Sequence, residues 1–281
     1  MVRLVKKKPM RRIFRSMTAT LMLFSMTMLI CTSFAQTGTH FLNTGSVYEI
    51  LSETIVNCML QDSEGFLWFG TQNGLYRYDG YGLKPYHLNS RISSQFSANF
   101  ITSIYEENSE SLWLGTFGGG LFKLDPKTEE YVNFIHDAQD NDSLSDNVVR
   151  TICMDDADRL WIGTQNSGLD CLDPVSGHFT HYRSTADQAG SLSANTIASI
   201  VKDKEGAMWI GTVEGGLNKF DSQSGRFIHY ENQDNDPGNL PDNGISKLYV
   251  DRANVLWIVT GQNRLSKFDP SSGEFMDNDL Q

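Results

Sequence analysis

The stretch RLWIGTQNSGLDCLDP, from Arg159 to Pro174, has the density of polar and aromatic residues that a catalytic signature would have. It combines a tryptophan, a Gly-Thr pair, a second glycine and aspartates within sixteen residues. A catalytic site normally occurs once, whereas a structural unit recurs. Similar stretches surround every tryptophan of the protein, at separations of 45, 48, 48 and 48 residues. These are Trp68, Trp113, Trp161, Trp209 and Trp257. We therefore interpret the stretch as a structural repeat.

The other residues suited to acid–base or nucleophilic chemistry form no catalytic pattern. The six histidines have no metal-ligand spacing, and no GxSxG signature of a serine nucleophile is present. His181 and His229 occupy the same place in successive repeats and are interpreted as ordinary surface positions. The Asp box of sialidase-like enzymes and the Trp-containing turn of quinoproteins are both absent. The sequence thus predicts no catalytic residue, no cofactor and no enzymatic activity, with an enzyme of a related repeat fold as the least favoured alternative.

The acidic segment HDAQDNDSLSDN, residues 136–147, contains the carboxylates and amides that bind calcium. It lacks the spacing and the turn glycine of an EF-hand loop. Because Asp and Asn are also the usual residues of turns, we predict no metal site there.

Each repeat has the pattern of four short strands separated by turns, represented by VVRTICMD, RLWIGT, GLDCLD and HFTHYR. An acid stands six residues before each tryptophan, and a residue that tolerates a left-handed backbone stands three before it in four of the five repeats. This spacing predicts a tight hairpin between the first two strands. The acids are Asp62, Glu107, Asp155, Asp203 and Asp251; the residues three before Trp are Gly65, Glu110, Asp158, Gly206 and Asn254.

Four antiparallel strands repeated at about 48 residues predict an all-β fold, a β-propeller. We expect about five blades, near residues 41–100, 101–148, 149–196, 197–244 and 245–281, as an incomplete part of a larger propeller. The links between blades repeat an apolar residue 17 positions before Trp and an Asn 14 before it, which are expected to pin the link and to bond its backbone. The fifth repeat departs from the pattern at Val259 and Arg264, where the others have glycine.

The repeated phrases LWIGT, GGL and FD, the links SLSDN and SLSAN, and the opening QDSEGFLWFGTQNGLYRYDG resemble two-component regulator propeller repeats. The resemblance extends over residues 41–281. It implies the periplasmic sensor region of a hybrid two-component histidine kinase of Bacteroidetes type. In that family, further propeller blades, an immunoglobulin-like domain, a membrane helix and a kinase follow, and none of these later domains is expected in this chain.

The N-terminal segment predicts export. Residues 1–35 contain seven basic residues and no acid, an apolar run MTATLMLFSMTMLI, and a cleavage pattern ending at Ala35. We therefore expect a signal peptide at 1–35, a periplasmic or otherwise extracytoplasmic mature chain, and no membrane span after cleavage. Removing these seven from the 23 basic residues leaves 16 against 34 acidic residues, a charge that disfavours nucleic acid as a partner. Cys58, Cys153 and Cys171 are interpreted as small buried hydrophobes.

A ligand is expected on the face shared by the interblade links and the hairpins between second and third strands. Amides with an occasional aromatic suit the hydroxyl groups of neutral sugars. The candidate ligand-binding residues are Gln72, Asn73, Phe117, Gln165, Asn166, Glu214, Gln262 and Asn263. The predicted function is a non-catalytic sensor of a glycan-derived ligand, an oligosaccharide, that acts with downstream signalling domains. A protein-interaction scaffold is the alternative.

Overall fold

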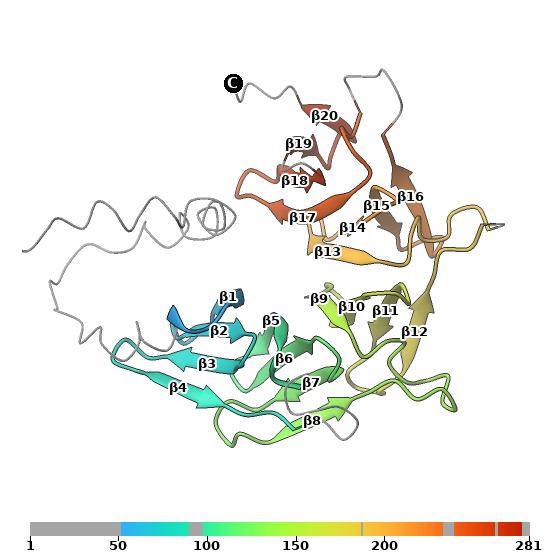
Figure 1. The fold of residues 1–281 in the computed structure, drawn as a ribbon. Helices are drawn as coiled ribbons and strands as arrows, with labels where there is room; N and C mark the ends of the chain where they lie inside the picture. The colour runs from blue at the N-terminus through green and yellow to red at the C-terminus, as the bar shows by residue number, and fades with distance from the viewer. Residues whose placement is uncertain (1–51, 90–97, 187, 233–238, 262–263, 277–281) are drawn as a thin grey trace, which may run out of the picture. The chain divides into compact units, whose positions relative to one another are not determined.

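The computed structural model describes residues 52–89, 98–186, 188–232, 239–261 and 264–276. All of them belong to the second of two compact units, Thr44–Gln281. Their twenty strands form five four-stranded antiparallel sheets (Figure 1). The predicted signal peptide lies outside the described residues.

Each sheet is one blade and uses its strands in chain order. Blade 1 contains β1 (Val56–Gln61), β2 (Leu67–Thr71), β3 (Gly74–Tyr78) and β4 (Leu83–Tyr86). Blade 2 contains β5 (Ile101–Asn108), β6 (Ser111–Thr116), β7 (Leu121–Leu124) and β8 (Tyr131–Phe134). Blade 3 contains β9 (Val149–Met154), β10 (Leu160–Thr164), β11 (Leu169–Leu172) and β12 (Phe179–Tyr182). Blade 4 contains β13 (Ile197–Lys202), β14 (Met208–Thr212), β15 (Leu217–Asp221) and β16 (Arg226–Tyr230). Blade 5 contains β17 (Ile245–Val250), β18 (Leu256–Thr260), β19 (Leu265–Asp269) and β20 (Glu274–Met276).

The first strand of each blade lies beside the first strand of the next, from β1 to β17. This arrangement and the hairpin order within each sheet are those of β-propeller blades. The predicted fold class is therefore confirmed.

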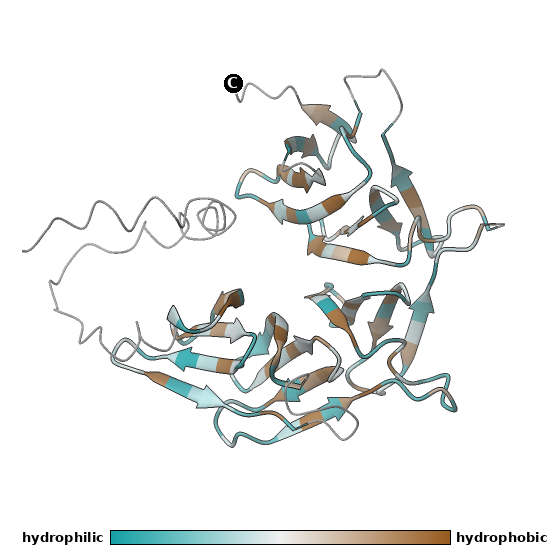
Figure 2. Ribbon diagram, in the orientation of Figure 1, coloured by the Kyte–Doolittle hydropathy of each residue, from teal (hydrophilic) through white to brown (hydrophobic). Residues whose placement is uncertain are grey.

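The hydrophobic core lies between consecutive blades. Each of the four core clusters combines the tryptophan of one blade with apolar residues from the first three strands of the next. Figure 2 shows the hydrophobic residues concentrated in the strands and the turns mostly hydrophilic. The tryptophans of blades 1 to 4 have 0% exposed surface, whereas Trp257 of blade 5 is partly exposed. In the part of the chain that the structure describes, no blade follows blade 5 to cover it.

A glycine two residues after each of the first four tryptophans permits this close packing. At Gly163 an added Cβ would lie 2.5 Å from Cγ2 of Ile197, the residue that begins β13 of the next blade. Gly115 and Gly211 have the same relation to Val149 and Ile245. Val259 takes the glycine's place in blade 5, the blade on which no described blade packs.

The predicted turns are confirmed in detail. The N–H of Gly65 donates to the carbonyl of Asp62, closing the hairpin between β1 and β2. Four of the residues three before Trp have positive φ, Gly65 (93°), Asp158 (58°), Gly206 (84°) and Asn254 (66°). The turn residues were identifiable because they need this backbone region.

The interblade links also follow the prediction. Leu144, Leu192 and Leu240 are buried, each in the cluster of the preceding blade's tryptophan. The side-chain oxygen of Asn195 accepts the N–H of Ser184, so that this link is hydrogen-bonded back onto itself. Asn99, Asn147 and Asn243 accept equivalent backbone N–H groups. Leu51 and Phe96, their counterparts in the first two repeats, lie outside the described residues.

Candidate functional site

The recurring acids are bonded to the tryptophans. In each blade one carboxylate oxygen accepts the indole Nε1–H of the tryptophan six residues later, at donor–acceptor distances between 2.7 and 3.0 Å. The other oxygen of each aspartate accepts backbone N–H groups of the hairpin. The five carboxylates therefore orient the core tryptophans.

Asp155 has the most complete set of these contacts. Its Oδ2 accepts Nε1 of Trp161 and Nε of Arg159, both at 2.8 Å. Burial alone would raise the pKa of Asp155, but these hydrogen bonds and the Arg159 charge outweigh it, so the pKa lies below its ordinary value of 3.8. A carboxyl with a depressed pKa stabilises the fold at neutral pH.

Replacing Asp155 by asparagine is expected to lower the free energy of unfolding by about 1.5–3 kcal/mol at pH 7, the usual contribution of hydrogen bonds to a charged group. The higher free energy of unfolding of the wild type is fully present above pH 3.8 and is lost as the pH falls through the lower pKa that Asp155 has in the folded state. Urea denaturation of both proteins at pH values from 7 to 2 measures this difference. The stabilities of wild type and variant should converge below pH 3.8; a difference that stays constant with pH would contradict the assignment.

The predicted ligand-binding residues lie on the hairpins between second and third strands. Gln72 and Asn73 lie between β2 and β3, Phe117 between β6 and β7, Gln165 and Asn166 between β10 and β11, and Glu214 between β14 and β15. Gln262 and Asn263 lie outside the described residues. Hydrogen bonds join these hairpins to the links, as from the N–H of Gly168 to the carbonyl of Asn195. Hairpins and links therefore share one end of the blades, here called the loop face.

Two of these side chains have contacts that limit their freedom. Oε1 of Gln165 accepts Nη1 of Arg150 at 2.7 Å. The ring of Phe117 is 51% exposed and lies 5.3 Å from that of Phe100. Glu214 and Asn73 are exposed.

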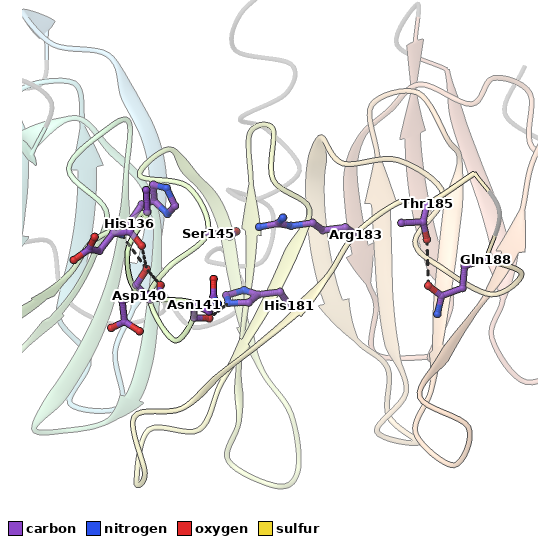
Figure 3. A pocket seen from close by; sticks show the side chains of 11 residues that line it. His136, Asp140, Asn141, Ser145, His181, Arg183, Thr185 and Gln188 are labelled. Carbon is purple, nitrogen blue, oxygen red and sulfur yellow. Dashed lines mark hydrogen bonds between the residues drawn. The ribbon is translucent and has the colours of Figure 1, made fainter.

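A cavity of about 430 Å³ lies between the link that enters blade 3 and the outer strand β12 (Figure 3). The link contributes His136, Asp137, Asp140 and Ser145 among others, and β12 with the segment after it contributes His181, Arg183, Thr185 and Gln188. None of the predicted loop-face residues lines it. The cavity is made by links, so it lies at the loop-face end of blade 3, beside its outer edge.

A hydrogen bond between the partly exposed His181 and the buried Asp170 forms one wall of this cavity. Nδ1 of His181 lies 2.7 Å from Oδ1 of Asp170, whose side chain is 0% exposed, and Nε2 lies 3.0 Å from the carbonyl of Asn141. The hydrogen bond to Asp170 raises the pKa of His181 above 6.5, against the opposing effect of burial. His181 is thus more than the ordinary surface residue that the sequence predicted. The contact could have been predicted from the hairpin that joins β11 to β12, because Asp170 and His181 stand directly opposite each other in it.

The three described cysteines are free thiols. Burial raises the pKa of Cys58 and of Cys171 to about 12 and that of Cys153 to about 11. Because only a thiolate is a good nucleophile or metal ligand, the raised pKa values disfavour both roles for these thiols at neutral pH.

Among the described residues, no cluster of three or more His, Cys, Asp or Glu side chains could hold a metal ion. The carboxylates of the acidic link instead accept backbone N–H groups, as Asp137 does from Gln139 and Asp140 from Asp142. No helix within the described ranges is long and apolar enough to cross a membrane.

The five four-stranded blades define a β-propeller protein. The family model of the "Two component regulator propeller" matches residues 50–73, 143–166 and 191–214. Three segments of the chain, in blades 1, 3 and 4, therefore match this family's repeat. A search of the curated proteins found no match.

Several solved structures are similar to the chain. The extracellular domain of a hybrid two component system from B. thetaiotaomicron is 26% identical with a TM-score of 0.66; the match covers 79% of this chain and 29% of that one. The chain thus spans less than a third of that solved domain. Virginiamycin B lyase from Staphylococcus aureus is 17% identical with a TM-score of 0.59, covering 80% and 71%. PorZ, a surface component of the type-IX secretion system of Porphyromonas gingivalis, is 17% identical with a TM-score of 0.58, covering 80% and 33%. The last two share the fold, which hosts an enzyme as well as non-enzymes.

Proposed function

We propose that the chain is a ligand-sensing, non-catalytic module of an extracytoplasmic two-component signalling protein. The observation that carries the proposal is the 26% identity, over 79% of this chain, to the extracellular domain of a hybrid two component system. The repeats of the same family in blades 1, 3 and 4 support it. The acids of the repeats are engaged with indole groups, which gives them a structural role in place of a catalytic one.

The proposal includes export and further domains. Residues 1–35 act as a signal peptide cleaved after Ala35, and the mature chain works in the periplasm or another extracytoplasmic compartment. The five blades are part of a larger propeller, and signalling domains beyond this chain transmit the response.

The ligand we propose is a glycan-derived oligosaccharide bound on the loop face. Gln72, Asn73, Gln165 and Asn166 offer amides that both donate and accept hydrogen bonds, which hydroxyl groups require. Phe117 offers an exposed aromatic surface on the same face. The mature chain, with 16 basic against 34 acidic residues, favours a ligand without negative charge.

Signalling would follow from differential binding. A ligand shifts a conformational equilibrium only if its affinity differs between the two states. An oligosaccharide that contacts hairpins of more than one blade meets this condition, because its affinity depends on their relative placement.

The test is calorimetric titration of the full chain with neutral oligosaccharides. We expect saturable binding that Gln165→Ala combined with Asn166→Ala weakens about tenfold, while Gln223→Ala, in the exposed turn between β15 and β16, leaves it unchanged. Binding to a protein partner without oligosaccharide binding would favour the scaffold alternative. Hydrolysis or elimination of the oligosaccharide would overturn the non-catalytic assignment.

A further inference from the structure

The cavity beside β12 contains a buried hydroxyl group with no partner in the protein. Ser145 is only 7% exposed, and its Oγ has no hydrogen-bond partner among the described residues. A buried polar group left without a partner costs about 1–3 kcal/mol. In the view of Figure 3 the Ser145 oxygen lies between His136 and Arg183.

In blade 4 the hydroxyl at the equivalent position has a hydrogen-bond partner. Ser193 stands at the position of Ser145, and its Oγ accepts Nδ2 of Asn218 at 2.7 Å. In blade 3 the counterpart of Asn218 is Asp170, whose Oδ2 accepts the backbone N–H of Ser145. A carboxylate has no hydrogen to donate, so it cannot replace the amide as donor to the hydroxyl oxygen. Of these two blades, blade 3 is the one that leaves the hydroxyl open.

Arg183 is an exposed residue at the edge of the cavity. It makes no hydrogen bond or ion pair with the described residues, and in Figure 3 its guanidinium points toward Ser145. Blade 4 has Glu231 at the corresponding position. An arginine with five donors and no protein partner is available to bind an external acceptor.

The cavity presents both donors and acceptors. The two ring nitrogens of His181 are already engaged, Nδ1 with Asp170 and Nε2 with the carbonyl of Asn141. The guanidinium of Arg183 supplies donors, and Asp137 and Asp140 supply carboxylates. Each of these two carboxylates uses Oδ1 to accept a backbone N–H, which leaves Oδ2 as an acceptor. A neutral ligand with many hydroxyl groups matches such a set of donors and acceptors.

We propose that this cavity binds one end of a neutral saccharide, a mono- or disaccharide unit. Arg183 donates to its hydroxyl oxygens, Asp137 and Asp140 accept its hydroxyl hydrogens, and Ser145 gains the partner that it lacks in the protein. The volume of about 430 Å³ falls within the range of small-molecule sites. The choice of a saccharide rests on the proposed function; the position, beside the loop face at the edge of blade 3, adds a subsite to it.

The binding site is tested by calorimetric titration of the full chain with cellobiose, maltose, xylobiose and mannobiose, and with glucuronate as an anionic comparison. We expect at least one neutral disaccharide to bind. Arg183→Met should weaken its binding about tenfold or more, and Ser145→Ala should weaken it several-fold. Arg252→Met removes an exposed arginine of blade 5, and Ser193→Ala removes the matching serine of blade 4; both should leave the affinity unchanged.

The outcomes separate this inference from the proposed function. If a disaccharide binds equally well to Arg183→Met, Ser145→Ala and the wild type but is lost in Gln165→Ala with Asn166→Ala, the cavity is not the subsite and the sensor proposal stands. If glucuronate alone binds, the neutral ligand class is wrong. Failure of every neutral saccharide to bind the wild type overturns both the subsite and the glycan ligand.

Discussion

Replacing Trp161 by alanine is expected to lower the free energy of unfolding by about 3–5 kcal/mol, the usual cost of deleting a fully buried aromatic side chain. The indole has 0% exposed surface and belongs to the cluster between blades 3 and 4. It stacks on Tyr182 at 5.5 Å and meets Phe220 edge-on at 4.7 Å. Its removal also takes a hydrogen-bond donor from Asp155. Urea denaturation followed by far-ultraviolet circular dichroism measures the loss.

Trp257→Ala is the matched control. Trp257 keeps the indole bond to its own acid, Asp251, at 2.8 Å, but it is partly exposed because no described blade covers it. Burial is the main difference between the two sites, so the control should cost clearly less than Trp161→Ala. Equal losses would mean that the indole bond, and not the packing between blades, provides the stability.

Replacing Gly163 by valine is expected to destabilise the protein by about 1–3 kcal/mol or more, the usual cost of overpacking a core. An added Cβ would lie 2.5 Å from Cγ2 of Ile197 and 2.7 Å from Cγ2 of Thr151. Blade 4 would have to move away from blade 3 to admit it. The midpoint of thermal unfolding and the urea denaturation curve both report the effect.

Two further variants identify the cause. Val259→Leu enlarges the side chain at the corresponding position of blade 5, and it should change the stability by no more than about 0.5 kcal/mol. Ile197→Ala removes the side chain that a valine in place of Gly163 would meet, so the double variant should cost less than the sum of the two single changes. Additive losses would show that the strand itself rejects valine, which would contradict the packing explanation.

The repeat, the four strands of each blade and the turns between them were predictable from the sequence. These features depend on local chemistry. Apolar residues are concentrated in strands such as β9, and turns need residues such as Gly206 and Asn254 that accept positive φ. The five tryptophans in register made the propeller the natural fold, because each blade must bury its apolar face against a neighbour.

The sequence did not reveal what those repeated residues contact. The acid six residues before each tryptophan was predicted as part of a turn, and its bond to the indole was missed. A local pattern shows that two positions recur together, but it does not show that their side chains meet. The loop-face residues stay a prediction, since the contacts of Gln165 and Phe117 describe their surroundings and not a ligand.

The tertiary structure alone decided the packing between blades and the cavity of blade 3. Gly163 meets Ile197, and Ser145 meets Asp170, only because separate segments of the chain are brought side by side. The exchange of Asn218 for Asp170 between two otherwise similar blades leaves one hydroxyl without a donor. In the sequence this is a single substitution in a strand, and its consequence depends on burial, which only the assembled blades provide.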